Sequence, residues 1–464
     1  MSNNKKINFE ISERKVLLRL FDVLFVFLAL HVFSNFFSFN YFQISTSNYY
    51  WLIVLGVYIN IFGSVFEMYN LQVASNQVQV IKSIVLTTSV TVLSYLLTPI
   101  FAPTLPKNRL QIIFFYFAVF LALFAWRMFY AKFFASQRFS KKVILVCDIE
   151  QVEELVLNLE KVDRHYKIIG FVNTQLNTNL DYCFNYIKNV DIDNLKDFVK
   201  QNSVSEIVVA SQKTDGITLS LYNQLISLLE KGFIIKEYTQ VYESLTLRIP
   251  MQYLSRDFYI FFPFSRSNSN KLYLFSVRFF EIIVAIIGIS FGFLFIPFIY
   301  LINLFANKGK LFYTQKRVGK NGKKFKILKF RTMIANAETD TPIFATTNDV
   351  RITPFGKFLR KSRIDEFPQF INILKGEMAV IGPRPERPVF VKEISKVMPF
   401  YETRHILKPG LTGWAQVNYS YGESIDDSLI KLQYDLYYIK HRSVFLDISI
   451  MFKTISTVLF YRGQ

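Results

Sequence analysis

The sequence has too few cysteine and histidine residues for the common thiolate and imidazole metal sites. Its 464 residues include two cysteines, Cys147 and Cys183, which are too few for a disulfide framework or a zinc site built on thiolates. The four histidines form no HExxH-type pair: they are His31, His165, His405 and His441. Disulfide-stapled folds and the usual zinc enzymes are therefore not indicated.

Acidic residues are also scarce, with 35 Asp and Glu against 54 Lys and Arg, and the formal net charge is +19. This balance predicts anionic partners such as lipid headgroups, phosphates or nucleic acid. Hydrophobic residues make up 51% of the chain and mean hydropathy is +0.25, which points away from a soluble protein. Because a nucleic-acid reader has no use for so much contiguous apolar sequence, we expect a membrane protein of two or three domains with no nucleic-acid partner.

No small-residue cleavage site follows the first apolar run, so we expect that run to stay as an anchor. Four stretches have the roughly 20 apolar residues that cross a bilayer: Leu20–Phe39, Tyr49–Tyr69, Ile81–Ile100 and Leu110–Phe134. They predict a four-helix membrane domain over residues 1–140. Basic residues at both ends of this block favour two cytoplasmic termini, although Lys107 and Arg109 lie in a loop that this topology expects outside.

After Lys141, short β-type runs alternate with amphipathic helices, which predicts a parallel, Rossmann-like α/β domain over residues 141–263. The expected strands are Val143–Val146, Ile168–Val172, Ile207–Val209 and Ile234–Ile235, and the expected helices are Val152–Leu159, Leu195–Val199 and Leu219–Glu230. The first strand runs into Asp148 without the glycine that brings backbone amides to a phosphate. A degenerate, regulatory or structural domain is therefore favoured over a working dinucleotide site, and residues 256–271 have the composition of a linker.

A fifth apolar run, Phe279–Ala306, has basic residues on both sides, so both of its ends carry the cytoplasmic signature. Pro297 lies within the run, where proline removes a backbone donor and clashes with the preceding turn. We predict a re-entrant helix that enters the membrane, breaks at Pro297 and leaves by the same face. The alternative is a slightly kinked fifth span.

The last third of the chain is polar and basic, and its first cluster is the stretch Gln315–Lys323, followed by Phe325–Met333. Alternation along a strand would place Lys329 and Arg331 on one face, directed toward a diphosphate. The plainer interpretation is a charged hairpin that favours anionic lipid.

The second cluster contains an acidic pair, Asp365 and Glu366. Ser362 three residues earlier predicts a helix start that would place both carboxylates in the opening turn, where the helix dipole favours ionisation. An ionised carboxylate can act as a nucleophile or bind a hard cation. A lone pair of this kind is otherwise an ordinary capping feature.

The third cluster, Gly376–Arg387, holds Arg384 between two prolines, and an arginine fixed in this way loses little entropy when it binds phosphate oxygens. A rigid loop with a surface arginine is the alternative. In the fourth cluster, Lys408–Val417, Trp414 offers a stacking face or an interfacial anchor.

Taken together in this order, the clusters resemble the monotopic polyprenyl-phosphate sugar-1-phosphate transferases, the bacterial sugar transferase family. The resemblance covers about Lys271–Gln464 and is carried by four motifs: Lys329–Met333, Asp365–Gln369, Gly382–Glu386 and Lys408–Val417. Over residues 1–263 only the layout matches, that of long members with four added spans and a degenerate Rossmann-like domain. The departures are small: Phe367 and Leu411 stand where the family often has Leu and Ile, and Ile296 rather than a serine precedes Pro297.

The resemblance implies a mostly helical monotopic catalytic domain over residues 271–464 and a two-step reaction. A sugar 1-phosphate would pass from a UDP-sugar, through a phosphosugar-aspartyl intermediate, to undecaprenyl phosphate. Asp365 would be the nucleophile, and Asp365 and Glu366 would hold Mg²⁺. Phosphate oxygens would be bound by Lys329, Arg331 and Arg384, with Arg317, Glu386, Arg387 and Arg404 as further candidates.

The resemblance also implies a place in the bacterial inner membrane, with the catalytic domain on the cytoplasmic face, at the initiating step of exopolysaccharide, capsule or O-antigen synthesis. A homodimer is expected from the long relatives, and the sugar stays open, with a lean toward glucose or galactose. One alternative is a membrane sensor whose α/β domain binds a ligand. Another is a site between the spans, but their acidic residues are mainly Asp22 and Glu67, near span ends.

Overall fold

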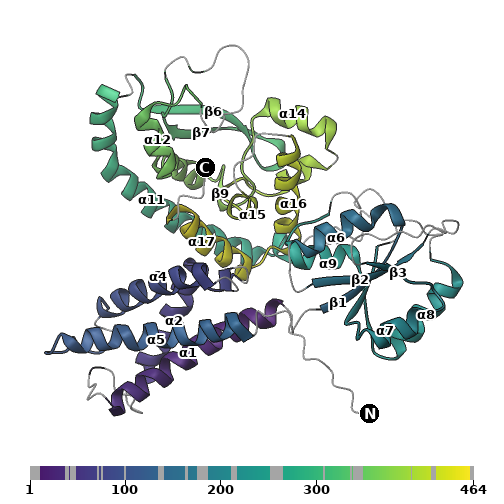
Figure 1. Cartoon of the computed structure of the whole chain (residues 1–464). Coiled ribbons are helices and arrows are strands. Elements are labelled where there is room, and N and C mark those ends of the chain that lie inside the picture. Colours follow the sequence, from purple (N-terminus) through teal and green to yellow (C-terminus); the bar gives the residue numbers. More distant parts are fainter. Residues whose placement is uncertain are drawn as a thin grey trace. The chain divides into compact units, whose positions relative to one another are not determined.

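The computed structural model describes residues 11–36, 41, 49–70, 73–74, 77–98, 101–133, 141–161, 166–174, 187–210, 217–250, 265–306, 309–334, 337, 349–398, 400–419 and 425–459. The chain divides into two compact units, residues 1–241 and 242–464. Each unit has hydrophobic clusters of its own. Figure 1 shows the elements of both units.

The first unit begins with four apolar helices: α1 (Ile11–Phe36), α2 (Tyr49–Val65), α4 (Gln77–Leu96) and α5 (Leu110–Phe133). Helix α1 packs along α5, and α4 packs along both α2 and α5. By length and composition, α1, α4 and α5 are candidate membrane spans, and α2, with 17 residues, is about 26 Å long. All four predicted helices are therefore present, while predicted span residues 37–39, 99–100 and 134 lie outside the described residues.

A buried ion pair joins α1 to α5 inside this bundle. The Nε atom of Arg127 donates to Oδ1 of Asp22 at 2.9 Å, and both side chains are fully buried. Arg127 also donates to the backbone oxygen of Met68 at 2.7 Å. A buried carboxylate that is paired in this way fixes helix packing, so Asp22 is occupied and does not support an active site between the spans.

The α/β domain contains a parallel five-stranded sheet in the order β3-β2-β1-β4-β5. Its strands are β1 (Lys141–Cys147), β2 (Tyr166–Asn173), β3 (Lys188–Asn189), β4 (Glu206–Val209) and β5 (Ile234–Glu237), and its helices are α6 (Val152–Glu160), α7 (Leu195–Gln201) and α8 (Leu219–Glu230). Every predicted strand and helix of this domain is confirmed. Strand β3 and helix α9 (Tyr238–Thr246) were not predicted.

Helix α9 crosses the boundary between the two units, and the chain that follows it belongs to the second unit. The indole N–H of Trp414 donates to the backbone oxygen of Leu247 at 3.1 Å. Glu243 accepts from Lys440 at 2.8 Å and contacts His441 at 2.5 Å. The second unit therefore begins before Lys271, where sequence motifs first become recognisable. Of the predicted linker, residues 256–264 lie outside the described residues.

The second unit is mostly helical, with two small sheets. Strands β6 (Phe312–Val318) and β7 (Lys324–Phe330) form an antiparallel hairpin, and β8 (Ala379–Ile381) pairs in parallel with β9 (Gly410–Thr412). The helices are α11 (Lys271–Ala306), α12 (Pro354–Lys361), α13 (Gln369–Lys375), α14 (Pro388–Val397), α15 (Trp414–Asn418), α16 (Ile425–His441) and α17 (Val444–Leu459).

Helix α11 is 36 residues long, contains Pro297 and is the fourth candidate span by length and composition. It is helical throughout, and its ribbon bends part-way along (Figure 1). Near its start, Arg278 donates to the backbone oxygens of Ile373 and Leu374, both at 2.8 Å. Near its end, Asn303 donates to the backbone oxygen of Gly309 at 3.1 Å. Ile299, about 31 Å further along the helix than Arg278, packs in one hydrophobic cluster with Phe330 and Leu359. Helix α11 therefore touches other parts of the second unit along much of its length.

Two glycines of α11 allow this close packing. A β-carbon at Gly288 would lie 2.4 Å from the ring of Phe370, and one at Gly292 would lie 3.6 Å from Phe367. Gly288 therefore allows the close approach of α11 to α13.

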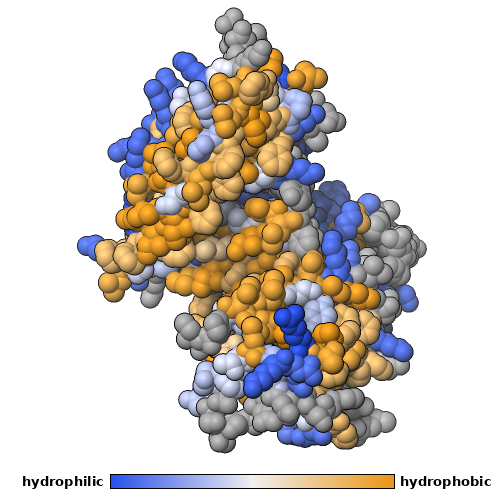
Figure 2. Space-filling model, turned by 90° about the vertical axis from the view of Figure 1, so that its left-hand side faces the viewer, coloured by the Kyte–Doolittle hydropathy of each residue, from blue (hydrophilic) through white to orange (hydrophobic). Residues whose placement is uncertain are grey.

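The opposite side of α11 is exposed and strongly apolar. Side chains that are at least half exposed include Leu272, Phe275, Phe279, Ile286, Phe291, Phe293, Leu294, Phe298 and Phe305. Helix α17 adds Phe445, which is 86% exposed. Figure 2 shows hydrophobic side chains spread over this side of the molecule. Exposed apolar surface of this extent marks a membrane contact.

Candidate active site

The acidic pair lies in a short 3-10 turn, Ile364–Glu366, directly before α13. Arg363, which precedes the turn, has a left-handed backbone conformation with φ of 60°. The prediction that Ser362 starts a helix is wrong. Ser362 instead follows the last residue of α12, and its hydroxyl donates to the backbone oxygen of Phe358 at 2.8 Å. The chain reverses at Arg363, the turn packs against β7, and Glu366 contacts Lys329 of that strand.

Three cationic side chains surround Glu366. Its Oε1 accepts from Lys329 Nζ at 3.0 Å and from Arg384 Nη2 at 3.1 Å, while its Oε2 lies 3.6 Å from Arg363 Nη1. Burial opposes ionisation of this side chain, but the charges of Lys329, Arg384 and Arg363 outweigh it and hold the pKa of Glu366 far below its usual range. Glu366 is therefore an ionised carboxylate with its charge already matched.

Asp365 is as deeply buried as Glu366, each being 7% exposed, but it has a different electrostatic environment. Among the described residues, no side chain forms a hydrogen bond or ion pair with its carboxylate. Burial raises the pKa of Asp365 to about 6, against the lowering effect of Lys329 and with a further increase from the charge of Glu366. Asp365 therefore titrates near neutrality and keeps its oxygens available.

Asn372 of α13 fixes the acidic turn relative to β7. Its Oδ1 accepts from the backbone N–H of Leu328 at 3.1 Å, and its Nδ2 donates to the backbone oxygen of Lys326 at 2.8 Å. These two hydrogen bonds tie α13 to the strand that carries Lys329. Packing of Ile373 and Ile327 in one hydrophobic cluster supports the same arrangement.

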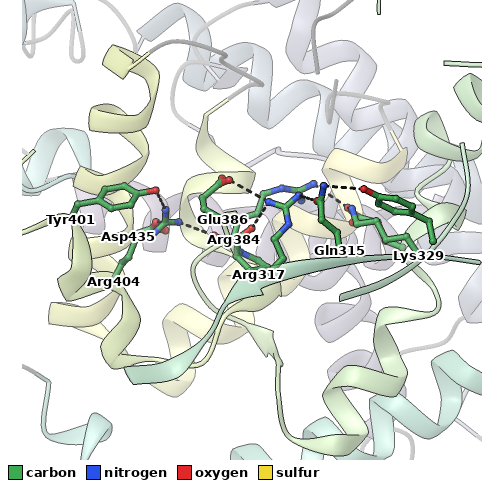
Figure 3. Close-up of polar contacts among 11 residues, drawn as sticks. Gln315, Arg317, Lys329, Arg384, Glu386, Tyr401, Arg404 and Asp435 are labelled. Carbon is green, nitrogen blue, oxygen red and sulfur yellow. Dashed lines mark hydrogen bonds and ion pairs between the residues drawn. The ribbon is translucent and has the colours of Figure 1, made fainter. Parts of the chain in front are cut away.

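Arg384 approaches Glu366 from the loop between β8 and α14. Figure 3 shows Arg384 beside Arg317 and Glu386, with Lys329 on one side and Arg404 on the other. The structure therefore brings Lys329 and Arg384 next to the acidic pair, and their role in binding phosphate stays a prediction. Arg317 and Arg404 lie close by, but their guanidinium groups contact the backbone of the loop, at Pro385 (3.0 Å) and Arg384 (2.9 Å) respectively.

Three other singled-out residues lie elsewhere. The guanidinium of Arg331 lies against Gly309, where a β-carbon would come within 2.7 Å of it, and Arg387 covers the ring of Phe390 at 5.5 Å. Trp414 is 3% exposed, so it is neither an exposed stacking face nor an interfacial anchor. No described contact joins these three side chains to the acidic pair.

Sequence reasoning missed Arg363, whose charge acts on both carboxylates, and Asp435, a buried partner of Arg404 at 2.7 Å. Arg363 directly precedes the acidic motif, so its proximity was a usable signal. Asp435 lies on α16, 31 residues after Arg404 in the sequence, so no local sequence pattern connects the two residues.

The acidic pair is also the candidate metal site. Within the described part of the chain, no group of three or more His, Cys, Asp or Glu side chains could hold a metal ion. Mg²⁺ does not need one, because it is commonly bound by one or two carboxylates, with water and substrate phosphates as the other ligands. The available oxygens of Asp365 fit such a site, whereas Glu366 already has three cationic neighbours.

Two regions of the chain are similar to known protein families. Residues 272–461 match the model of the bacterial sugar transferase family, and residues 64–218 match a model described as a CoA-binding domain. A putative undecaprenyl-phosphate N-acetylgalactosaminyl 1-phosphate transferase of Bacillus subtilis (strain 168) is 39% identical over 153 residues, which are 32% of this chain and 86% of the relative. The chain belongs to the bacterial sugar transferase family.

Longer relatives match over a smaller part of their length. The UDP-N-acetylgalactosamine-undecaprenyl-phosphate N-acetylgalactosaminephosphotransferase of Aeromonas hydrophila is 42% identical over 221 residues, 47% of this chain and 51% of the relative. The UDP-glucose:undecaprenyl-phosphate glucose-1-phosphate transferase of Escherichia coli (strain K12) is 41% identical over 154 residues, 32% of this chain and 33% of the relative. The chain thus spans about half or a third of the length of these relatives.

Proposed function

We propose that this family member transfers a sugar 1-phosphate from a UDP-sugar to undecaprenyl phosphate, giving undecaprenyl-diphosphate-sugar and UMP. The observation that carries the proposal is the contrast within the acidic pair. Asp365 is buried, without a direct partner among the described residues, and close to cations, while Glu366 is neutralised by three of them. This arrangement supports a nucleophile beside a fixed cationic pocket.

In the first step, an Asp365 carboxylate oxygen attacks the sugar-linked phosphorus of the donor. The bond from that phosphorus to the bridging oxygen breaks, and UMP leaves with the electron pair. In the second step, a phosphate oxygen of undecaprenyl phosphate attacks the same phosphorus and releases the Asp365 carboxylate. Burial that raises the pKa of Asp365 to about 6 leaves most of the side chain ionised at pH 7 and poorly solvated, and both favour attack.

Lys329 and Arg384 would stabilise the charge that develops on the phosphate oxygens. Both already meet at a single oxygen of Glu366, at 3.0 and 3.1 Å, so their ammonium and guanidinium groups are held within a few ångströms of each other. Preorganised cations of this kind lower the barrier to phosphoryl transfer, because they stabilise the negative charge on the equatorial oxygens of the transition state.

Mg²⁺ is part of the proposal, with Asp365 as the ligand whose oxygens are available; Glu366, which Lys329, Arg363 and Arg384 already surround, would be the second ligand only if one of these cations gave way to the metal. When bound, it would neutralise charge on the diphosphate. The roles of this chain's own residues are to present the carboxylate, exclude water and hold the cations. Five further residues remain predicted to bind phosphate: Arg317, Arg331, Glu386, Arg387 and Arg404. Arg331 lies against Gly309 and Arg387 covers Phe390, while Arg317 and Arg404 contact the backbone of the loop that carries Arg384.

The contacts of α11 support a re-entrant helix with the catalytic domain on the cytoplasmic face of the bacterial inner membrane. A straight span would carry the two ends of α11 to opposite sides of a core about 30 Å thick. Arg278 nevertheless donates to the backbone of α13, and Ile299, about 31 Å further along the helix, packs in one cluster with Phe330 and Leu359. The exposed apolar side of α11 would enter the membrane, with the bend of the helix allowing return. The acidic turn directly precedes Phe367 and Phe370, which pack on Gly292 and Gly288, and it would then lie at headgroup depth.

The pathway, the sugar and the homodimer remain parts of this proposal. Relatives named for N-acetylgalactosamine and for glucose are both similar to this chain, so the similarity does not select a sugar. Initiation of exopolysaccharide, capsule or O-antigen synthesis is the role that such a product would serve.

The decisive experiment is release of UMP by the purified full chain in nanodiscs, with undecaprenyl phosphate and a panel of UDP-sugars. We expect one or two donors to support release, and labelled sugar phosphate to be trapped on the protein when the acceptor is omitted. Asp365→Asn should abolish trapping, whereas Glu206→Gln, in the α/β domain, should preserve it. Full UMP release by the Asp365 variant would refute the nucleophile assignment.

A further inference from the structure

The loop that carries Arg384 is held by its backbone at every residue. Its four consecutive carbonyl oxygens accept hydrogen bonds as follows: Pro383 from the Gly410 N–H (2.9 Å), Arg384 from Arg404 Nη2 (2.9 Å), Pro385 from Arg317 Nη1 (3.0 Å) and Glu386 from the Val318 N–H (2.9 Å). Two of the four residues are prolines, whose φ angles are fixed. A loop constrained in this way has little freedom to move.

Two of these four donors are arginines, and each arginine is paired with a carboxylate. Arg404 lies 2.7 Å from Asp435 Oδ2, and its Nη1 donates to the Tyr401 hydroxyl at 2.6 Å. Arg317 lies 3.4 Å from Glu386 Oε2. Figure 3 shows Arg404 and Asp435 on one side of Arg384, and Arg317 and Glu386 beside it. The guanidinium groups are therefore committed to internal partners on both sides of the loop.

The pair on the α16 side is the more deeply buried one. Arg404 is 6% exposed and Asp435 is 1% exposed, and the Arg404 guanidinium is already bonded to Asp435, the Tyr401 hydroxyl and the Arg384 carbonyl. A buried ion pair is costly to form in a protein interior, and replacement by apolar residues is often neutral for stability. Its presence directly behind Arg384 therefore calls for a role other than stability.

We propose that Asp435 and Arg404 are positioning residues that act through the backbone of Arg384. Asp435 orients the Arg404 guanidinium, which fixes the Arg384 carbonyl and so directs the Arg384 side chain at Glu366 and the donor phosphate. Arg317, with Glu386, has the corresponding role on the next carbonyl. The proposal rests on the proposed function and changes the assignment of Arg404 and Arg317 from phosphate ligands to supports.

The test is a double-mutant cycle between the loop arginine and the buried pair. The first change is Arg384→Ala, which we expect to lower kcat/KM for the UDP-sugar about a hundredfold, in line with loss of one preorganised donor. The second is the paired replacement Arg404→Met with Asp435→Leu, which removes both charges and leaves no unpaired ion. In the wild-type background this replacement should lower kcat about tenfold with little change in Tm.

The proposal predicts that the effects of Arg384→Ala and of the paired replacement on kcat are not additive. If the buried pair acts through Arg384, the paired replacement should cost less than twofold once Arg384 is alanine. An equal tenfold loss in both backgrounds, or no loss in either, would overturn the proposal. The control is Glu243→Gln, which breaks the ion pairs from Lys440 and His441 on the same helix α16. Any loss of activity from this control should be the same in both backgrounds.

A second readout is independent of turnover. Hydrogen exchange at the Val318 and Gly410 amides, which donate to the Glu386 and Pro383 carbonyls of the loop, should become at least tenfold faster in the paired replacement, while the amides of α14 keep their wild-type protection. Unchanged exchange at Val318 and Gly410 would also overturn the positioning role. If no UDP-sugar supports UMP release, the proposed function fails, and exchange still decides whether the loop is held in this way.

Discussion

Glu206 of the α/β domain and Asp365 of the second unit are both buried carboxylates, but only Glu206 has direct hydrogen-bond and ion-pair partners among the described residues. Glu206 is 2% exposed, and it accepts from the Tyr166 hydroxyl and lies 3.3 Å from Lys236 Nζ and 3.9 Å from Lys141 Nζ. Asp365 has no such direct contact among the described residues, although Lys329 and Arg363 are near enough to affect its pKa.

The difference separates a structural acid from a reactive one. A buried carboxylate with several partners stabilises the fold, because the partners replace the water that it has lost. A buried carboxylate without a direct partner reduces stability and keeps its lone pairs for chemistry. Substitutions at the two positions should therefore have opposite effects on stability and on turnover.

The largest expected effect is that of Asp365→Asn. Loss of the nucleophile should lower UMP release at least about ten-thousandfold. Removal of a charge that burial disfavours should stabilise the fold by about 2 to 3 kcal/mol at pH 7. Measured Tm in nanodiscs together with UMP release tests both halves. Glu206→Gln is the matched comparison and should lower stability by about 3 kcal/mol while leaving kcat within about twofold; equal signs for the two Tm changes would contradict the distinction.

Lys329→Met should have the next largest effect. It removes one of the two cations at Glu366 Oε1, and kcat should fall by about a hundredfold to a thousandfold. The pKa of Glu366 should rise, because a main opposing charge is lost. Lys326→Met on the same strand is the control and should keep near-normal turnover. Equal losses of kcat in the Lys329 and Lys326 variants would argue against a specific role for Lys329 in binding the donor phosphate.

The pH dependence should follow Asp365. Attack requires the carboxylate, and since burial raises its pKa to about 6, kcat should fall about tenfold for each pH unit below that value. The stability effect has the opposite sign: a folded-state pKa above the ordinary value of 3.8 means that Asp365 favours folding when protonated, and this contribution is lost as pH rises from about 4 to about 6. The Tm difference between wild type and Asp365→Asn should therefore disappear at pH 4 and persist at pH 7.

The smallest effect concerns the support beneath the acidic turn. Gly288→Ala would place a β-carbon 2.4 Å from the Phe370 ring, and the resulting shift of α13 should cost about 1 to 3 kcal/mol and a few-fold in kcat. Gly292→Ala in the same helix would create only an ordinary contact at 3.6 Å with Phe367. Measured Tm and kcat for this second variant should match wild type, and similar losses for both would discount the close-approach argument.

Much of the fold could be predicted from the sequence, because its signals are local. Apolar runs marked the four N-terminal helices, and alternation marked every main strand and helix of the α/β domain. The predictions failed where a residue's environment depends on distant chain. Ser362 is a residue type that often starts a helix, but here it follows the end of α12. Trp414 is covered by the chain around Leu247, which lies more than 160 residues earlier in the sequence.

The site shows the same division. The acidic pair, Lys329 and Arg384 could be found because each belongs to a compact motif. The actual targets of Arg317 and Arg404 could not, because a cationic side chain has the same sequence signature whether it binds a ligand or a carbonyl oxygen. Roles for these residues in phosphate binding, and for Asp365 and Glu366 in binding Mg²⁺, stay predictions.

The contacts of residues 243–249 have a practical consequence for work on isolated fragments. A fragment that starts at Lys271, where the recognisable family region begins, would leave the Trp414 indole without the Leu247 oxygen and would leave Lys440 and His441 without Glu243. It would also expose the cluster that Ile249 helps to fill. A cut before Tyr242 keeps these partners together, so the natural start of the folded catalytic body lies about 30 residues upstream of the point that family resemblance alone suggests.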